Sequence, residues 1–296
     1  MYNKAILIYN VNAGKTEVDN IFKQIIPILT KGIKHLMLSK TEKAGDAEII
    51  AREYGADFDL LISLGGDGTL HEVINGIAEL ETPPLVAILP AGTCNDFARS
   101  LNLPLNMEEA AENILKGEIK SINIGKINER YFTNFVGTGL ITQISDNINP
   151  NTKNLMGKIS YYTAAVKTLK EQEDFHFKLT TENETIEDDA AMIIILNGSH
   201  VGSTFVPVKS IDLQDNLFDI FIVYDAGLAL LMKYITQKEN FEDQVSHDEI
   251  KHIQAKNIKI NTQSKMELDT DGEIYLKTPI EISVLDKNIQ FITGKL

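Results

Sequence analysis

The pattern of apolar residues along the chain changes near residue 118. Before that point, short apolar runs alternate with segments whose apolar residues recur at helical spacing. The predicted strands are 4–9, 33–38, 60–64 and 85–89, and the predicted helices are 18–29, 44–54, 69–78 and a segment after residue 93. Strands that alternate with helices in this way predict βαβ crossovers and a mostly parallel sheet.

After residue 118 the chain carries a series of short strand signals. They cover 121–127, 131–136, 175–180, 190–196, 218–224, 253–260 and 280–285, with two predicted helices near 160–169 and 227–236. This pattern is typical of a β-sandwich, and the acidic segment 182–189 is predicted to be a solvated hairpin. We therefore predict an N-terminal α/β domain over residues 1–120 and a C-terminal β-sandwich domain over residues 121–286.

Glycine and polar residues gather just after the predicted strands of the first domain. The clearest group is Gly65-Gly66-Asp67-Gly68-Thr69, which follows an apolar run. Because ordering glycine costs conformational entropy, this cluster indicates a close approach of the backbone to something else. Bare amide N–H groups can hold anionic oxygens, and Asp67 can orient a metal ion. A tight strand-to-helix turn capped by Asp67 is the structural alternative on this segment alone.

Composition narrows the class of protein. The chain has 296 residues, of which 43% are hydrophobic, and a net charge of −14 without a basic run, which argues against a nucleic-acid groove. The single cysteine, Cys94, excludes an internal disulfide and a cysteine-based zinc site. We expect no signal peptide, because strand-like residues follow Met1 almost at once, and no apolar segment is long enough to span a bilayer. These features predict a cytoplasmic protein.

One motif resembles a phosphate-binding loop without completing it. Gly14-Lys15-Thr16 follows a predicted strand, as the end of a P-loop would. A full P-loop needs a glycine five positions before Gly14, where this chain has Tyr9. The spacing therefore does not favour a P-loop.

Four motifs in order resemble the diacylglycerol kinase catalytic family. They are Asn10-Val11-Asn12-Ala13-Gly14, the segment 65–76, the segment 92–99 and Asp271-Gly272-Glu273. The resemblance covers nearly the whole chain and is best to the bacterial soluble lipid kinases; sphingosine and ceramide kinases belong to the same family. It implies a Rossmann-like α/β nucleotide-binding domain followed by a β-sandwich domain, with the active site in the cleft between them. It also implies that the last strand, 289–292, returns to the first domain, so that residues 287–296 complete it.

The resemblance implies the roles of particular residues. Glu273 would be the catalytic base, and Asp67 would act with the metal. The residues implied to bind ATP are Asn10, Val11, Asn12, Ala13, Gly14, Thr41, Gly65, Gly66, Asp67, Gly68, Thr69, Leu70, His71, Glu72 and Thr93. His71 replaces a common asparagine of the family, and an exposed residue in the first helical turn is its alternative interpretation.

A structural magnesium site is also implied, in altered form. The family commonly has Asp-Asp-Gly where this chain reads Gln214-Asp215-Asn216. The metal ligands implied here are Asp215, Asp212 and Leu217, with one carboxylate and the glycine of the family pattern replaced. Asn216 can adopt a left-handed backbone conformation, so the shape of the loop is predicted to persist.

The implied activity is ATP- and Mg²⁺-dependent phosphorylation of diacylglycerol to phosphatidic acid, as in phospholipid biosynthesis. The acceptor would be reached by peripheral contact with a membrane, and a homodimer is expected. Two alternatives stay within the family: another lipid alcohol, such as phosphatidylglycerol or a sphingoid base, or a catalytically inactive nucleotide-binding protein. NAD kinases and phosphofructokinases use a related Gly-Gly-Asp turn, but the segment 95–99 and the placement of Asp271-Gly272-Glu273 favour a lipid kinase.

Overall fold

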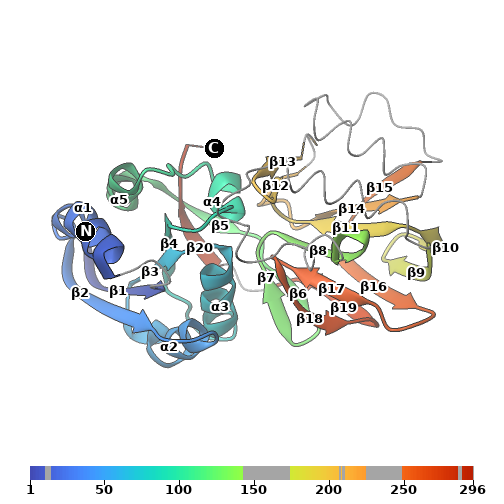
Figure 1. The fold of residues 1–296 in the computed structure, drawn as a ribbon, viewed down its shortest axis with the longest axis horizontal. Helices are drawn as coiled ribbons and strands as arrows, with labels where there is room; N and C mark the ends of the chain where they lie inside the picture. Colours follow the sequence, from blue (N-terminus) through green and yellow to red (C-terminus); the bar gives the residue numbers. More distant parts are fainter. Residues whose placement is uncertain are drawn as a thin grey trace. The chain divides into compact units, whose positions relative to one another are not determined.

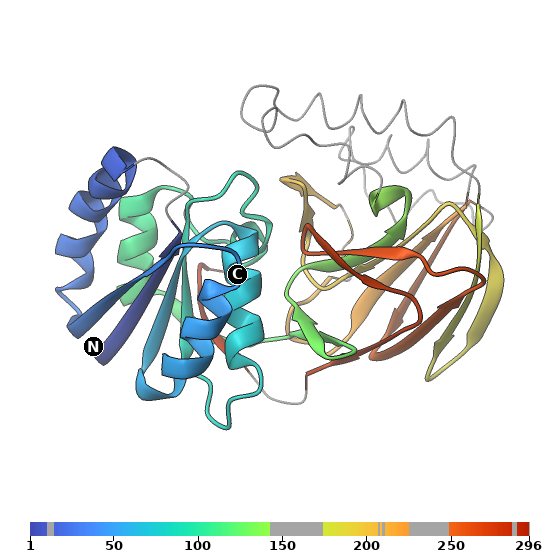
Figure 2. The ribbon, with the colours of Figure 1, turned by 60° about the horizontal axis from the view of Figure 1, so that its bottom comes forward.

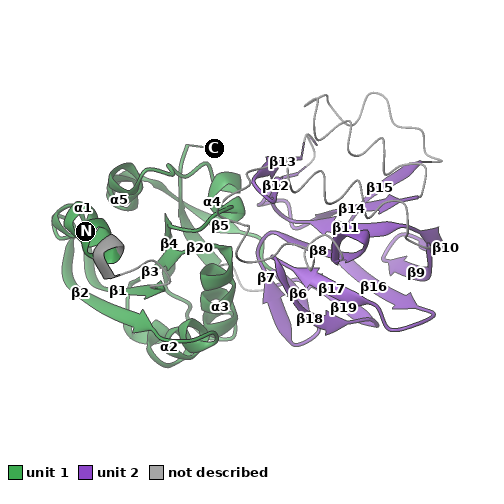
Figure 3. Cartoon of the chain, in the orientation of Figure 1, with its two compact units in different colours: residues 1–124, 286–296 green, residues 125–285 purple. Residues whose placement is uncertain are grey.

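The computed structural model describes residues 1–10, 15–142, 174–206, 208, 211–224, 249–285 and 289–295. The chain divides into two compact units, shown in Figure 3. Unit 1 comprises Met1–Ile124 with Asp286–Leu296, and unit 2 comprises Gly125–Leu285. The helices predicted near 160–169 and 227–236 lie outside the described residues. Among the described helices, none has the length and apolar character needed to cross a membrane.

Unit 1 is built on a six-stranded sheet with the order β2-β1-β3-β4-β20-β5 (Figure 1). The strands are β1 (Tyr2–Asn10), β2 (Ile33–Thr41), β3 (Leu60–Gly65), β4 (Leu85–Pro90), β5 (Glu118–Ile122) and β20 (Ile289–Thr293). The first four strands pair in parallel, and β20 lies parallel to β4, whereas β5 runs antiparallel to β20. The predicted parallel sheet and the return of the last strand are both confirmed.

Helices cover both faces of this sheet because its central strands are apolar on both sides, as parallel strands usually are. The helices are α1 (Lys15–Leu29), α2 (Asp46–Tyr54), η1 (Gly55–Asp57), α3 (Asp67–Ile77), α4 (Asp96–Ser100) and α5 (Met107–Lys116). Ile25 of α1 and Ile114 of α5 share one buried cluster with Leu7 and Ile62 of the sheet. Helices α2 and α3 lie on the other side of the sheet (Figure 2).

Unit 2 is a sandwich of two antiparallel six-stranded sheets, ordered β10-β9-β16-β19-β6-β7 and β15-β14-β11-β8-β17-β18. The strands of the first sheet are β6 (Gly125–Ile127), β7 (Arg130–Phe132), β9 (Phe175–Thr181), β10 (Thr185–Ala190), β16 (Asn257–Thr262) and β19 (Ile280–Val284). Those of the second are β8 (Phe135–Gly139), β11 (Met192–Leu196), β14 (Phe218–Val223), β15 (Ile250–Ala255), β17 (Glu267–Thr270) and β18 (Glu273–Lys277).

The sandwich core joins side chains from both sheets of unit 2. Phe177 and Ile282 of the first sheet share a buried cluster with Ile193, Phe218 and Leu268 of the second. A separate two-stranded hairpin consists of β12 (His200–Val201) and β13 (Thr204–Phe205). The predicted β-sandwich is confirmed.

Three of the predicted strands are in fact pairs of strands. The predicted strand 121–127 divides into β5 and β6, which belong to different units, and 131–136 divides into β7 and β8. The predicted strand 253–260 breaks at Lys256, whose N–H donates to the Glu182 carboxylate at 2.8 Å, as does the N–H of Asn257 at 3.1 Å. The apolar pattern does not mark the first two breaks, because the residues around them stay buried, whereas Lys256 and Asn257 are exposed at the third.

Gly66 and Gly92 bring the backbones of the loops that follow β3 and β4 into contact. A Cβ atom placed on Gly66 would lie 3.1 Å from the Cα of Gly92, and one placed on Gly92 would collide with the Cα of Gly66. Beside them, the N–H of Ala91 donates to the carbonyl of Gly65 at 2.9 Å. Packing of the protein against itself therefore requires glycine at position 92 and leaves little room for a side chain at position 66.

We predict that Gly92→Ala lowers the free energy of unfolding by about 1–3 kcal/mol, because the added methyl group meets backbone that no rotamer change can move. Urea denaturation measures the loss, and Ala91→Ser, at the exposed neighbouring position, is the control. A Gly92→Ala protein as stable as that control would contradict the packing argument.

Candidate active site

The predicted nucleotide residues of unit 1 lie at one edge of the sheet. Asn10, the last residue of β1, stands directly opposite Thr41, the last residue of β2. In the same way Gly65 at the end of β3 stands opposite Pro90 at the end of β4. Because these strands are parallel, their carboxyl ends form the crevice where ligands of such sheets bind. The predicted residues Val11, Asn12, Ala13 and Gly14 lie outside the described residues.

The N-terminus of α3 lies at this edge, because the helix begins at Asp67, two residues after the end of β3. Gly66 is its N-cap and has an extended backbone, and no side chain caps the helix from that position. The amides of Asp67, Gly68 and Thr69 form the first turn, and the first amide that bonds back along the helix is that of Leu70, to the Gly66 carbonyl at 3.2 Å. Helix N-termini in general attract anions, because their first N–H groups have no partner within the helix and the helix dipole adds to the effect.

Two carboxylates of α3 hold neighbouring loops. Asp67 Oδ1 accepts a hydrogen bond from the N–H of Phe97 at 3.2 Å, which ties α3 to α4. Glu72 accepts from the N–H of Gly45 at 2.8 Å and from that of Ala47 at 3.1 Å, at the start of α2. Because the N-cap of α2 is Gly45, which has no side chain, Glu72 supplies the cap from a distant part of the chain.

Other predicted ATP-binding residues of α3 point into the protein. Leu70 and His71 are 2% and 3% exposed, and the side chain of Thr69 lies against Gly65, whose Cβ would be 2.7 Å from that of Thr69. The interpretation of His71 as an exposed first-turn residue is wrong, because α3 packs with this face inward. A nucleotide contact at these positions stays a prediction, and it would use backbone amides.

The loop after β4 is closed by its own hydrogen bonds. Asn95 has a left-handed backbone, and its side-chain amide both accepts from the N–H of Gly92 and donates to the carbonyl of Gly92, each at 2.8 Å. Phe97 is fully buried and packs edge-to-face on Phe291 of β20, with ring centroids 5.5 Å apart. These contacts hold the loop in place. The predicted residue Thr93 is exposed on it.

In unit 2, the predicted base Glu273 is exposed at the start of β18, directly after a two-residue turn. Asp271 and Gly272 form the turn with φ angles of 56° and 91°. Positive φ at both central residues is what the tight hairpin turn of an Asp-Gly pair requires. The turn therefore places Glu273 at a position fixed by backbone geometry.

Asp271 is the anchor of this turn, and the sequence did not reveal that role. Its buried carboxylate accepts hydrogen bonds from the N–H groups of Thr133, Asn134 and Phe135 at 2.8, 2.8 and 3.0 Å, and from the Thr133 hydroxyl at 3.1 Å. The N–H of Asp271 in turn donates to the carbonyl of Phe135 at 3.1 Å. These bonds join the β17–β18 turn to the start of β8.

Two side-chain-to-backbone hydrogen bonds lie within the predicted metal loop. Asp212 accepts from the N–H of Gln214 at 2.9 Å, and Asp215 accepts from that of Leu217 at 2.8 Å. Asn216 has a φ of 63°, which confirms its predicted left-handed conformation.

The charges around this loop are compatible with a cation. Desolvation raises the pKa of the Asp215 carboxyl, and the nearby carboxylates of Asp212 and Asp219 act in the same direction, although the N–H of Leu217 opposes them. Within the described ranges, no three or more His, Cys, Asp or Glu side chains gather as a metal cluster. A hard cation at this loop would thus be held by few carboxylates together with carbonyl oxygens and water.

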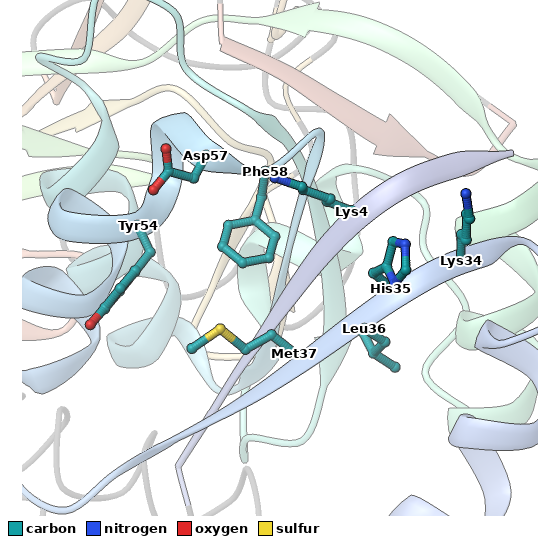
Figure 4. Close-up of a pocket in the computed structure, with 8 residues that line it drawn as sticks. All are labelled: Lys4, Lys34, His35, Leu36, Met37, Tyr54, Asp57 and Phe58. Atoms are coloured by element: carbon teal, nitrogen blue, oxygen red, sulfur yellow. The ribbon is translucent and has the colours of Figure 1, made fainter.

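A cavity in unit 1 lies away from these residues. It is lined at the amino-terminal halves of β1 and β2 by Lys4, His35 and Met37, and near the end of α2 by Tyr54 and Phe58 (Figure 4). None of the predicted site residues lines it.

Sequence comparison assigns both halves of the chain to known domain families. The family described as "Diacylglycerol kinase catalytic domain" matches residues 4–127, and that described as "YegS C-terminal NAD kinase beta sandwich-like domain" matches residues 134–293. A Staphylococcus epidermidis protein named "Putative lipid kinase" is 36% identical over 298 residues, covering 99% of this chain and 97% of the relative.

Solved structures agree with this assignment. The crystal structure of "a putative diacylglycerol kinase" from Bacillus anthracis superposes with a TM-score of 0.89 at 36% identity, covering 99% of this chain and 97% of that one. An Archaeoglobus fulgidus NAD kinase in complex with ATP has a TM-score of 0.52 at 13% identity, which indicates a shared fold alone.

We predict that Asp271→Asn lowers the free energy of unfolding by at least about 2 kcal/mol, because an amide N–H₂ group would then face backbone N–H donors in a buried site. Asparagine tolerates positive φ, so the turn itself is not strained by the change. Urea denaturation gives the comparison with Thr133→Val, which removes only one of the four donors. Equal stability of the two variants would contradict the anchoring role of Asp271.

Proposed function

This chain belongs to the diacylglycerol kinase catalytic family, and from that premise we propose that it transfers the γ-phosphoryl group of ATP to the primary hydroxyl of diacylglycerol. The observation that carries the proposal is the intact Asp271-Gly272-Glu273 turn, in which an exposed carboxylate stands on a rigidly anchored hairpin. The product would be phosphatidic acid. Lipid kinase activity is what the family supports, and diacylglycerol is the acceptor that we propose.

The proposed reaction is a single displacement at the γ-phosphorus. Glu273 accepts the proton of the acceptor hydroxyl as the oxygen forms its bond to the γ-phosphorus, and the bond from that phosphorus to the β-phosphate bridging oxygen breaks to release ADP. A primary alcohol is a weak nucleophile while protonated, so the reaction needs a base at this point. An exposed carboxylate on a fixed turn meets that need.

The edge of the unit 1 sheet supplies what ATP phosphates require. The first-turn amides of α3 and the exposed Thr93 offer hydrogen-bond donors, and Asn10 and Thr41 stand side by side at the ends of β1 and β2. Asp67 is the carboxylate nearest these amides in the chain, and its side chain accepts a hydrogen bond from the N–H of Phe97. It is the proposed partner of a magnesium ion on the nucleotide. That ion would offset phosphate charge in a protein whose net charge is −14.

Two other functions remain as alternatives to be separated by experiment. Another lipid alcohol, such as phosphatidylglycerol or a sphingoid base, would use the same base and the same nucleotide edge. A nucleotide-binding protein without catalysis is favoured by the replaced metal motif at Gln214-Asp215-Asn216, and it would bind ATP without transferring phosphate.

We predict that Glu273→Gln lowers kcat for lipid phosphorylation about 100-fold or more, because glutamine cannot accept the proton of the acceptor. Transfer of radiolabel from ATP to diacylglycerol in mixed micelles is the measurement. Glu267→Gln, an exposed carboxylate of the same hairpin paired with Lys277 at 3.1 Å, is the matched control and should retain activity. Near-normal turnover by Glu273→Gln would overturn the mechanism.

We also predict that Asp67→Asn lowers kcat by roughly tenfold or more while the protein remains folded. Asparagine can still accept the hydrogen bond from Phe97 through its side-chain oxygen, so the loss would reflect the missing charge. The same transfer assay with a circular-dichroism melt separates the two effects. An active Asp67→Asn enzyme would show that this charge does not act on the nucleotide.

For the loop around Asp215 we predict a magnesium effect on stability without nucleotide. Millimolar Mg²⁺ should raise the thermal midpoint of the wild type by roughly 2 °C or more, because a cation relieves the repulsion between Asp215 and its neighbouring carboxylates. Asp215→Asn should lose this response and, without Mg²⁺, should be at least as stable as the wild type. An equal Mg²⁺ response in both proteins would place the ion elsewhere.

A further inference from the structure

Strand β2 forms a free edge of the unit 1 sheet. It is the first strand in the sheet order, and β1 is the one described strand that pairs with it. Figure 1 shows β2 at one margin of this sheet. The strand is nine residues long, and the N–H and C=O groups of such an edge are open to a partner unless side chains or a covering element protect them.

Lysine gathers along this strand and its two ends, although the protein as a whole is acidic. Residues 31–43 include four lysines and a single acidic residue, Glu42. The whole chain has 28 lysines and arginines against 42 aspartates and glutamates. The local excess of positive charge is therefore opposite in sign to the net charge of −14.

The two lysines within β2 have no ion-pair partner among the described residues. Lys34 and Lys40 are both exposed. Lysines on other elements are engaged, because five of them lie 2.7–3.1 Å from a carboxylate: Lys116, Lys178, Lys251, Lys259 and Lys277. Lys34 and Lys40 thus carry positive charge that no carboxylate of the described chain pairs with.

Leucine side chains lie between these two lysines on one face of the strand. Because successive side chains of a strand point to opposite faces, positions 34, 36, 38 and 40 share a face, and they read Lys-Leu-Leu-Lys. Leu36 packs against the buried cluster of unit 1, whereas Leu38 is 43% exposed. Lysines alone would serve to keep other strands away from the edge, but an exposed leucine between them does not. Cationic and apolar side chains together are typical of surfaces that bind anionic bilayers.

The opposite face of β2 combines the same two kinds of side chain. His35 stands opposite Lys4 of β1, and both line the cavity of unit 1 together with Met37 and Tyr54 (Figure 4). Met37 and Tyr54 are 39% and 40% exposed, and Lys4 has no ion-pair partner among the described residues. The cavity measures about 790 Å³, and Asp57 is the one carboxylate that lines it. Both faces of the edge therefore present unpaired lysine beside exposed apolar surface.

We propose that the outer edge of β2, with Lys34, Leu38 and Lys40 on one face and the cavity on the other, docks the protein onto an anionic phospholipid bilayer. The lysine ammonium groups bind lipid phosphates, and the exposed apolar side chains enter the boundary between headgroups and acyl chains. Charge complementarity disfavours a second copy of the chain as the occupant, because pairing two β2 edges would bring the lysines of both copies together. The inference rests on the proposed function, since a lipid kinase must meet its acceptor at a bilayer.

Vesicle sedimentation without ATP tests this directly. The whole chain is incubated with vesicles of phosphatidylcholine alone and with vesicles of phosphatidylcholine and phosphatidylglycerol in equal parts. The wild type should bind the anionic vesicles more tightly, and added salt should weaken that binding, because salt screens exposed charges. The double variant Lys34→Gln/Lys40→Gln should lower the partition coefficient roughly tenfold or more, since each lysine near an anionic surface contributes about fivefold.

A third variant and a matched control accompany the double variant. Leu38→Gln keeps both charges and should weaken vesicle binding at every salt concentration, because it removes only apolar surface. The control is Lys178→Gln/Lys259→Gln, which removes the same charge from the neighbouring strands β9 and β16 of unit 2, where the two lysines are paired with glutamates at 2.8 and 2.7 Å. It should bind vesicles as the wild type does.

Phosphorylation assays separate docking from catalysis. Lys34→Gln/Lys40→Gln should phosphorylate dispersed dioctanoylglycerol at the wild-type rate, because neither lysine belongs to the proposed catalytic or nucleotide-binding residues. With long-chain diacylglycerol in anionic vesicles at limiting lipid, the same variant should be slower by roughly tenfold, in proportion to its weaker binding.

Equal vesicle binding by the β2 double variant and the unit 2 control would overturn the inference, as would wild-type binding that does not depend on anionic lipid. A change of oligomeric state in Lys34→Gln/Lys40→Gln, measured by light scattering without lipid, would assign the edge to a second copy of the chain and overturn it as well. Failure of the proposed function looks different, because vesicle binding would then still depend on β2 while the wild type transferred no phosphate even to dispersed dioctanoylglycerol.

Discussion

The interaction on which the rest of the candidate active site depends is the one between the buried Asp271 carboxylate and its four donors at the start of β8. A carboxylate buried in a sandwich is costly unless hydrogen bonds compensate its lost hydration. Here the compensation comes mostly from backbone N–H groups, which cannot rotate away. The turn that carries Glu273 is consequently fixed to a central strand of its sheet. The position of Tyr275, two residues later on β18, is fixed with it.

In unit 1, carboxylates also accept hydrogen bonds from backbone N–H groups of neighbouring loops at the sheet edge. The carboxylates of Asp67 and Glu72 accept backbone hydrogen bonds from α4 and from the start of α2, and Gly66 and Gly92 bring two loops into backbone contact. Residues that a motif assigns to a ligand therefore also hold the loops that form the site. In Glu72 the hydrogen bonds to α2 involve both carboxylate oxygens, so its contribution to nucleotide binding would act through the position of the loop that follows Thr41.

The sequence predicted the architecture well because burial follows simple periodicities. The parallel strands β1, β3 and β4 each contain a largely apolar run, and the buried apolar residues of α3 recur at helical spacing. Periodicity could not separate β15 from β16, because the break at Lys256 depends on the distant Glu182. It also could not show that His71 is buried, since its burial follows from how α3 packs on the sheet.

The candidate site was predictable in part for a similar reason. An Asp-Gly pair by itself indicates a tight turn, and Asp271 and Gly272 form such a turn with positive φ angles. The partners of Asp271 are more than 130 residues away in the chain, and neither spacing nor composition connects them. The contact between the Arg130 guanidinium and the ring of Tyr275 has the same character, because it joins the edges of two sheets.

In the function that we propose, the anchored Glu273 turn serves phosphoryl transfer to a lipid alcohol. The most direct measurement is product analysis after incubating the purified protein with γ-labelled ATP, Mg²⁺ and mixed micelles that contain diacylglycerol, phosphatidylglycerol and a sphingoid base together. We predict label in a lipid phosphomonoester, with phosphatidic acid the main product. ATP binding by calorimetry with no label in any lipid would contradict it.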